Sequence, residues 1–273
     1  MKKLMLATLT VIVIIGCVKD IPYTDQPIPI SFDAGLSSVN TRAPIANLTS
    51  GLTGIQILRA ADIATSPDWS VVSSVATTAN IAAGGSVGSL SVAQYYNANP
   101  ALNAWFMAFY PSGTMGTGKV SWTITGQEDI IVAPSVSAGN KTIPVNPTTL
   151  AFAHKLTQLQ FEVLAASATA ITQWGTVSSI KVNADTALEL TLSTNALASA
   201  SSPVNTDLTI SGTFPVTLTT SAAAVGVIMV KPKDALNTIK VTTANSPEQT
   251  VSISGLTTTV AGSAHKITLT FTE

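Results

Sequence analysis

The stretch LQFEVLA at residues 159–165 decides the fold class of this 273-residue chain. Its apolar residues Leu159, Phe161 and Val163 alternate with polar ones, which is the period of a β-strand with one buried face. The stretch KVSWTITG at 119–126 has the same alternation. Both stretches therefore predict strands that pack one face against a core.

Similar stretches recur along the second half of the chain. Threonine, valine and isoleucine dominate them, and β-branched residues favour strands. Turn residues separate the stretches at roughly 8–12-residue spacing, which is typical of a β-sandwich or barrel. Pro215 lies between two of them. Because proline cannot donate a hydrogen bond to a neighbouring strand, this position fits an edge or a bend better than the middle of a sheet. Further strands are expected at 179–184, 188–193, 207–214, 216–220, 225–232, 238–244, 249–255 and 266–272. The predicted fold class is all-β.

Helix is expected only as a minor component. Residues 91–102 could form a short helical turn that ends before Pro100, because residues that precede proline avoid the α region. Residues 192–201 are rich in alanine but also in serine and threonine, so a helix and a loop are both open. Neither segment has a sustained period of 3.6 residues.

Two prolines near the middle of the chain indicate a domain boundary. Pro144 and Pro147 precede a new run of alternating apolar residues at 150–156. We therefore predict one domain at 24–147 and a second at 148–273, each of ordinary domain size.

The first 16 residues have the composition of a secretory signal. Two lysines precede about 12 mostly apolar residues, too few to cross a membrane that needs roughly 20. Gly16 comes directly before Cys17, the only cysteine of the chain. This ending resembles the signal of bacterial lipoproteins, whose cysteine is acylated. We expect a signal peptide at 1–16 and a lipidated tether at 17–23; the alternative is an ordinary signal with a cysteine nearby.

Composition and motifs argue against two classes of function. Only 10% of residues are charged and the net charge is −1, whereas nucleic-acid binding needs concentrated basic residues. The two histidines, His154 and His265, lie far apart in the sequence without the neighbours of a metal site or a catalytic triad. The glycine-rich segment 82–89 lacks the lysine of a phosphate-binding loop. We expect no nucleic-acid partner, no enzyme activity, no metal and no cofactor.

Three aromatic residues are candidates for ligand contacts. Trp69 follows a Ser-Pro-Asp sequence, and Tyr95 and Tyr96 precede an Asn-Ala-Asn-Pro turn. Exposed rings stack on sugars, so glycan contact is one interpretation and burial is the other. Trp105 and Trp122 lie in alternating stretches and are expected in the core.

Four motifs carry a resemblance to a known family. They are PIPISFDAGLSSVNTRAPI at 27–45, AWFMAFYP at 104–111, LAFAHKLTQLQFEV at 150–163 and VAGSAHKITLTFTE at 260–273. Their order and spacing resemble the fimbrillin and fimbrillin-like lipoproteins of Bacteroidetes, in the type V pilin superfamily. The third motif looks like a strand with a central His-Lys-Leu that opens the second domain of these proteins. The resemblance implies two tandem transthyretin-like β-sandwich domains with Greek-key connections.

The resemblance also implies a maturation step. Assembling members of the family are exported as lipid-anchored precursors, and an arginine-specific protease then removes their first strand. Here the cut would fall between Arg42 and Ala43 and would remove a strand with Ile28, Ile30 and Phe32 on its buried face. A strand from a neighbouring subunit would then fill the groove by donor-strand exchange. The alternative is that Arg42 is an uncleaved linker residue.

Two functions are consistent with this resemblance. The first is a fimbrial, or pilus, subunit that acts in adhesion. Because no obvious extension follows the expected strand at 266–272, we expect a tip or accessory subunit that accepts a strand from other fimbrial subunits. The second is a non-polymerising surface lipoprotein that binds a glycan or a host protein. Both interpretations place the chain at the outer membrane, lipid-anchored through Cys17, on the cell surface or in a fimbrium.

Overall fold

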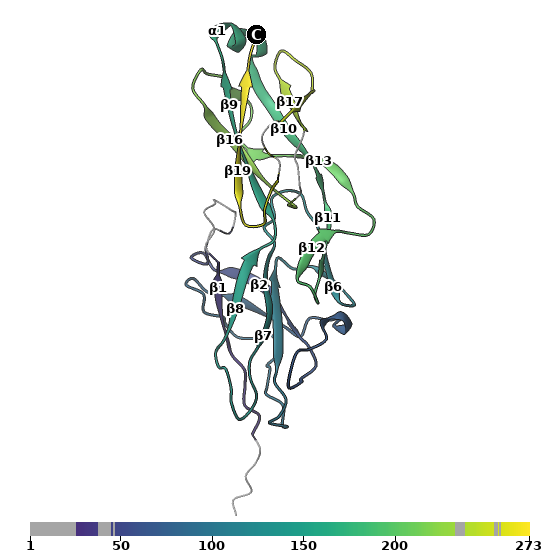
Figure 1. Cartoon of the computed structure of the whole chain (residues 1–273). Helices are drawn as coiled ribbons and strands as arrows, with labels where there is room; N and C mark the ends of the chain where they lie inside the picture. Colours follow the sequence, from purple (N-terminus) through teal and green to yellow (C-terminus); the bar gives the residue numbers. More distant parts are fainter. Residues whose placement is uncertain (1–25, 38–44, 46, 233–237, 254–255, 257) are drawn as a thin grey trace, which may run out of the picture.

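The protein is an elongated body made almost entirely of β-strands (Figure 1). The structure, a computed structural model, describes residues 26–37, 45, 47–232, 238–253, 256 and 258–273. The strands of the first half are β1 (Phe32–Leu36), β2 (Leu52–Arg59), β3 (Thr77–Ile81), β4 (Trp105–Tyr110), β5 (Thr114–Gly116), β6 (Lys119–Thr123), β7 (Ile131–Ser137) and β8 (Thr148–His154). A 3₁₀ turn, η1 (Trp69–Val71), lies between β2 and β3.

The second half begins at β9, which contains the stretch that opened the sequence analysis. Its strands are β9 (Thr157–Ala165), β10 (Thr176–Asp185), β11 (Ala187–Thr191), β12 (Ala196–Ser199), β13 (Asn205–Thr209), β14 (Ser211–Gly212), β15 (Val216–Thr217), β16 (Ala223–Val230), β17 (Thr238–Thr243), β18 (Gln249–Ser252) and β19 (Ala264–Phe271). The predicted all-β class is confirmed, and each predicted strand is present in whole or in part. One of them, at 207–214, is split into β13 and β14. The end of the one predicted at 249–255 lies outside the described residues.

A six-stranded sheet, in the order β1-β8-β7-β4-β2-β3, organises the lower part of the molecule in Figure 1. At β4 both faces of this sheet are buried, which explains why β4 is apolar at nearly every position. Phe106 and Ala108 belong to the core on one face, whereas Met107 and Phe109 belong to the core on the other. A second sheet, β12-β11-β6-β5, contributes Val120 and other residues to that second core.

Strand pairing does not follow the predicted boundary at 147/148. Strand β8 pairs with β7 and β1 of the first sheet, and β11 pairs with β6. The alternation at 150–156 defines a strand correctly, but the pattern carries no information about the sheet that the strand joins. Three strands from beyond residue 147, β8, β11 and β12, therefore lie in the sheets of the first half.

The His-Lys-Leu motif joins two strands instead of lying within one. Strand β8 ends at His154 and β9 begins at Thr157, and the two strands belong to different sheets. The Nζ atom of Lys155 donates a hydrogen bond to the backbone oxygen of Asn195, 2.8 Å away. Leu156 is fully buried in the core beneath β6 and β11. The motif thus secures the crossing between the two halves.

The upper part of the molecule contains two further sheets around a third core. One runs β13-β10-β17-β18, with β15 on β10, and the other runs β14-β16-β9-β19. Leu159, Phe161 and Val163 are buried in this core while Gln160 and Glu162 are partly exposed, as the alternation predicted.

Helix is a minor component, as predicted, but it lies at neither of the two segments considered. Residues 91–102 contain no helix, and within 192–201 a turn leads into strand β12. The α-helix of the described residues is α1 (Ala168–Trp174). The Ser167 side chain accepts a hydrogen bond from the Ala170 N–H at its start, and Gly175, with φ of 71°, ends it. This short helix is defined by its caps, because seven residues are too few for a clear apolar period.

Candidate functional site: the slot filled by residues 28–36

Residues 28–36 lie in a slot along the edge of the six-stranded sheet. Strand β1 pairs in parallel with β8, in a register that runs from Phe32 opposite Thr148 to Leu36 opposite Phe152. At one end the Thr148 N–H donates to the Ser31 oxygen at 2.9 Å. The first wall of the slot is therefore the backbone of β8.

The second wall is formed by chain that is not a regular strand. The Ile30 N–H donates to the Gln94 oxygen at 2.8 Å, and the Tyr96 N–H donates to the Ile28 oxygen at 3.0 Å. Further along, the Ala34 N–H donates to the Gly85 oxygen at 2.8 Å. The segment is hydrogen-bonded on both sides and fills a space between two walls.

The side chains of this segment complete a core. Ile30 and Phe32 are each only 3% exposed, and Ile28 packs against the same core while partly exposed. The ring of Phe32 lies edge-on to that of Phe106, with centroids 4.9 Å apart. Their burial matches the alternation predicted for these residues. Without them the Phe106 side of the core would be open to water.

Asn146 and Gly85 shape the two ends of the slot. The Asn146 Oδ1 atom accepts a hydrogen bond from the Ser31 N–H at 2.9 Å, and its Nδ2 donates to the Pro29 oxygen at 3.2 Å. Gly85 has φ of 97°, and a β-carbon there would lie 2.4 Å from the Ala34 oxygen. Only glycine permits so close an approach in this conformation.

A partly buried arginine stiffens the second wall. Arg59 Nη2 lies 2.9 Å from Asp62 Oδ2 and donates to the Tyr95 oxygen, also at 2.9 Å. Its Nη1 donates to the Gln94 side chain at 3.2 Å, and the guanidinium lies 5.4 Å from the centre of the Phe106 ring. The wall formed by Gln94 and Tyr95 is thus fixed by an ion pair and by a cation–π contact.

A buried contact between a histidine and an aspartate ends β8. His154 Nδ1 lies 2.9 Å from Asp129 Oδ2, and the two side chains are 1% and 0% exposed. Asp129 Oδ2 also accepts a 3.4 Å hydrogen bond from the Ile45 N–H. The pair links the end of the first wall to the chain that follows the predicted cleavage point. His154 thus lies in the interior of the protein, not on an accessible surface.

The structure corrects two of the predicted ligand contacts. Trp69 is 5% exposed in the core beneath η1, and Tyr96 is 6% exposed with its hydroxyl donating to the Ala138 oxygen at 3.0 Å. Neither ring is available for stacking on a sugar, because the surrounding core already covers it. Tyr95, by contrast, is 43% exposed. Trp122 is buried as predicted, and Trp105 is partly buried.

The other predicted sites lie outside the described residues. These are Cys17, Arg42 and Ala43. Sequence reasoning missed the second wall of the slot, Gly85 and Gln94 to Tyr96, because these residues form no alternating stretch. The glycine-rich composition of 82–89 was the one local signal, and it identifies a close backbone approach instead of a phosphate site.

Comparison with protein families gives the same class as the sequence motifs. A family model described as fimbrillin-like matches residues 41–273. Because the match covers most of the chain, this protein belongs to the fimbrillin-like family. No protein of curated function matches the sequence.

Solved structures share the fold at low sequence identity. A putative cell adhesion protein from Bacteroides uniformis superposes with a TM-score of 0.61 at 18% identity, over 92% of this chain and 94% of that one. A second, from Bacteroides ovatus, gives a TM-score of 0.59 at 16% identity, over 90% and 92% of the two chains. A fimbrial protein from Bacteroides vulgatus gives 0.49 at 12% identity, over 89% and 95%.

Membership of this family favours a structural role over catalysis. The described part of the chain also contains no helix that is long and apolar enough to cross a membrane.

Proposed function

We propose that this protein is a fimbrial subunit of the bacterial cell surface that acts in adhesion. Its membership of the fimbrillin-like family and its similarity in fold to putative cell adhesion proteins support this assignment. We further propose that it is exported as a precursor lipidated at Cys17, anchored in the outer membrane, and cut after Arg42 by an arginine-specific protease.

The two-walled slot is the observation that carries this proposal. Release of residues 17–42 would remove the strand that contains Ile30 and Phe32. Backbone groups of β8 on one side, and of Gly85 and Gln94 on the other, would lose their partners. Such a groove, with an apolar floor and two rows of unpaired backbone groups, favours the insertion of another strand. The incoming strand would come from another fimbrial subunit.

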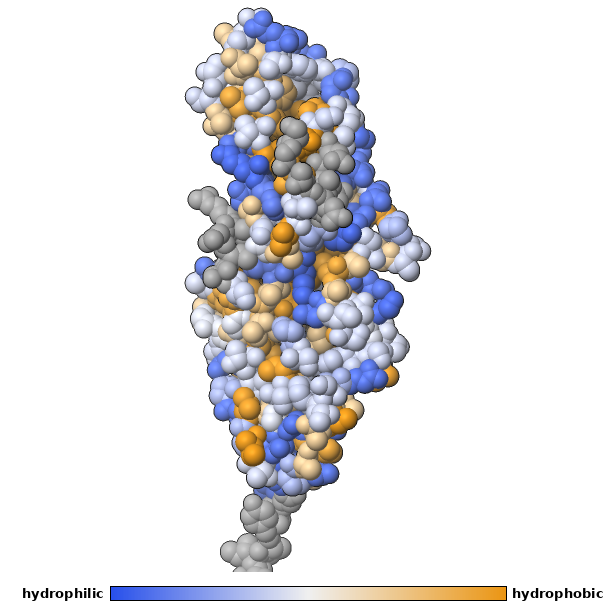
Figure 2. All heavy atoms as spheres, viewed as in Figure 1, coloured by the Kyte–Doolittle hydropathy of each residue, from blue (hydrophilic) through white to orange (hydrophobic). Residues whose placement is uncertain are grey.

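Within a fimbrium we propose a tip or accessory position, in which the chain accepts a strand. The second candidate function is that of a non-polymerising surface lipoprotein that binds a glycan or a host protein. Exposed apolar side chains favour such a contact surface. Figure 2 shows several at the lower end of the molecule. Ile143, Val145 and Tyr95, in connections between strands of the six-stranded sheet, are 71%, 47% and 43% exposed.

The test is the mature N-terminus of the protein in sheared surface fibres and in the membrane fraction. We expect fibre-associated protein to begin at Ala43 and membrane precursor to be blocked at Cys17. The variant Arg42→Lys keeps the charge but removes the arginine, so it should accumulate as precursor. A lipid-bearing monomer that is identical in wild type and variant, and absent from fibres, would exclude the processed-subunit model and favour the second candidate.

A further inference from the structure

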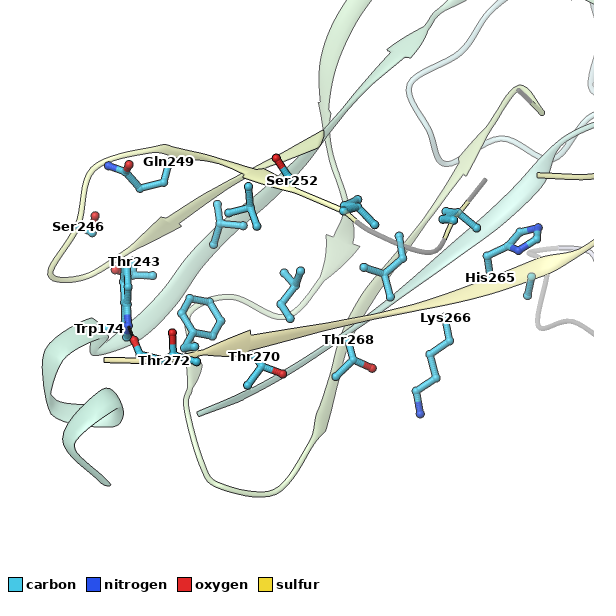
Figure 3. Close-up of a pocket in the computed structure, with 18 residues that line it drawn as sticks. Trp174, Thr243, Ser246, Gln249, Ser252, His265, Lys266, Thr268, Thr270 and Thr272 are labelled. Carbon is cyan, nitrogen blue, oxygen red and sulfur yellow. Dashed lines mark hydrogen bonds between the residues drawn. The ribbon is translucent and has the colours of Figure 1, made fainter. Parts of the chain in front are cut away.

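The upper part of the molecule contains a second groove, between β18 and β19. Each of these strands lies at the edge of one of the two sheets that enclose the third core. The groove has a volume of about 700 Å³, within the range of ligand pockets. Figure 3 shows the two strands on opposite sides of it, with side chains from both directed into the space between.

The floor of the groove is apolar with a period of two. Ile267, Leu269 and Phe271 of β19 line it, and only Ile267 is fully buried. Lys266 and Thr268 point away from β18 in Figure 3. On the other wall, Val251 of β18 is 37% exposed. The groove therefore leaves apolar side chains accessible that would be covered in a closed sandwich.

One end of the groove is held firmly. The ring of Trp174 lies 5.7 Å from that of Phe271, in an edge-on arrangement. Its Nε1 donates a 2.7 Å hydrogen bond to the backbone oxygen of Thr272. These contacts fix β19 at the end where the chain leaves the sheet, so its outer edge is a defined surface.

Both walls are strand edges without a neighbour on the groove side. Among the described residues, β18 pairs with β17 and β19 pairs with β9, and neither has a second ladder partner. In the six-stranded sheet the corresponding neighbours β7 and β8 do pair, through Ile131 opposite His154 and Val132 opposite Ala153. The upper pair of sheets is thus open between β18 and β19, whereas the six-stranded sheet is continuous between the corresponding strands β7 and β8.

We infer that the groove between β18 and β19 binds an extended segment of another polypeptide as an added β-strand. Such a segment carries apolar residues at every second position to cover Leu269 and Phe271. Its backbone pairs with the free edges of β18 and β19, which a sugar or a lipid chain cannot do. Polar side chains at the rim, Gln249 and Ser252, face the solvent-side residues of the segment.

This groove is separate from the slot of β1 and needs no proteolysis to open. The identity of the partner, another fimbrial subunit, rests on the proposed function, whereas strand binding itself does not. An isolated peptide therefore tests the groove independently of fimbrial assembly.

The test uses a labelled nine-residue peptide that has a lysine at each end and alternating valine and threonine between them. Binding to the purified protein is followed by fluorescence anisotropy and by backbone hydrogen exchange. We expect saturable binding and slower exchange in 249–253 and 264–271. The same peptide with methylated alternate backbone nitrogens should bind about tenfold more weakly, because it has lost the donors on one edge.

Two matched variants locate the site. Val251 and Thr250 are neighbours on an exposed strand, but only Val251 lines the groove. We expect Val251→Arg to weaken binding by about tenfold, because the arginine puts a charge into the apolar groove, and Thr250→Arg to leave it within about twofold. Absence of binding, equal effects of both variants, or equal binding of the methylated peptide would overturn the inference. If the peptide binds as expected but the protein is absent from fibres, the proposed fimbrial function is wrong and the inference of strand binding in the groove still holds.

Discussion

The two halves of this molecule share one order of strand pairing, and in the upper half that order is broken between β18 and β19. In the lower half, β4 pairs with β7, β7 with β8, and β8 in parallel with β1. In the upper half, β17 pairs with β18 and β19 pairs in parallel with β9, but β18 and β19 do not pair within the described residues. One sheet is continuous, and the other is interrupted by a groove.

The difference shows two ways in which a sandwich can present a strand-sized binding site. The lower half is complete because residues 28–36 fill their slot with Ile30 and Phe32. The upper half leaves Leu269 and Phe271 partly exposed between two free edges. The first site requires a strand to leave before another enters, whereas the second is accessible in the folded protein.

The largest expected effect comes from removing a buried ring of the strand that fills the slot in the lower half. Phe32→Ala should lower the free energy of unfolding by about 3–5 kcal/mol, because it leaves a cavity beside Phe106. The matched change Phe271→Ala should cost less than about 2 kcal/mol, because that ring already borders an open groove. Urea denaturation of both variants measures the difference. Equal losses would contradict the distinction between a filled and an open site.

A smaller effect is expected where the second wall approaches β1. Gly85→Ala should destabilise the protein by about 2 kcal/mol, because its new β-carbon meets the Ala34 oxygen in a conformation that favours glycine. Gly84→Ala has a similar φ of 91° but no atom within 4 Å of the added carbon. It controls for backbone strain alone. If the two variants have the same unfolding midpoint, close contact with β1 contributes nothing.

Loss of one indole hydrogen bond should have an effect of about 1 kcal/mol. Trp174→Phe removes the bond to the Thr272 oxygen, and Trp105→Phe removes a similar bond to the Ile63 oxygen at 2.9 Å. We expect both to lower stability slightly. Only Trp174→Phe should speed hydrogen exchange in 264–271, because it releases the end of a strand with a free edge. Faster exchange there in both variants would show that β19 depends on the whole fold.

The smallest effect concerns acid sensitivity of the upper half. A hydrogen bond from Lys240, then one from Asn183, holds the pKa of Asp207 below its usual value. A hydrogen bond from Lys181 likewise lowers the pKa of Glu248. A carboxylate with a lowered folded-state pKa stabilises the protein above its unfolded-state pKa, and this stability disappears as the pH falls through the folded-state value.

Lys240→Met should therefore lose less stability than the wild type as the pH falls below about 4. The measurement is the urea midpoint of both proteins between about pH 3 and 7. Lys119→Met removes the same charge from the other half, where Lys119 pairs with Glu189 at 2.8 Å. It reports the effect of losing one lysine and its ion pair at a position that does not contact Asp207. An unchanged slope in Lys240→Met would contradict a role for the Asp207 carboxylate in this pH range.

Local sequence predicted the strands well because the side-chain period is a local property. The alternation at Leu159, Phe161 and Val163 was sufficient to predict both β9 and its buried face. Sheet membership was not predictable in the same way. The alternation at Leu150 and Phe152 located β8, but its pairing with β1 joins residues more than 100 positions apart in the chain.

Burial of single aromatic residues was equally beyond local patterns. Trp69 follows a loop-like sequence and is nevertheless buried, because the η1 turn lies against the core between the two sheets. Tyr96 was an expected ligand contact, and its hydroxyl instead bonds the oxygen of Ala138, 42 residues away. In both cases the environment is created by distant segments.

The sequence by itself determined the all-β class, most strands, and the apolar face of residues 28–32, because each depends on a repeat of two residues. The second wall of the slot and the groove between β18 and β19 were decided only by the tertiary structure. Both depend on which backbone edges find a partner. The partner of β1 lies more than 100 residues away along the chain, and the alternation of side chains within one strand does not specify it.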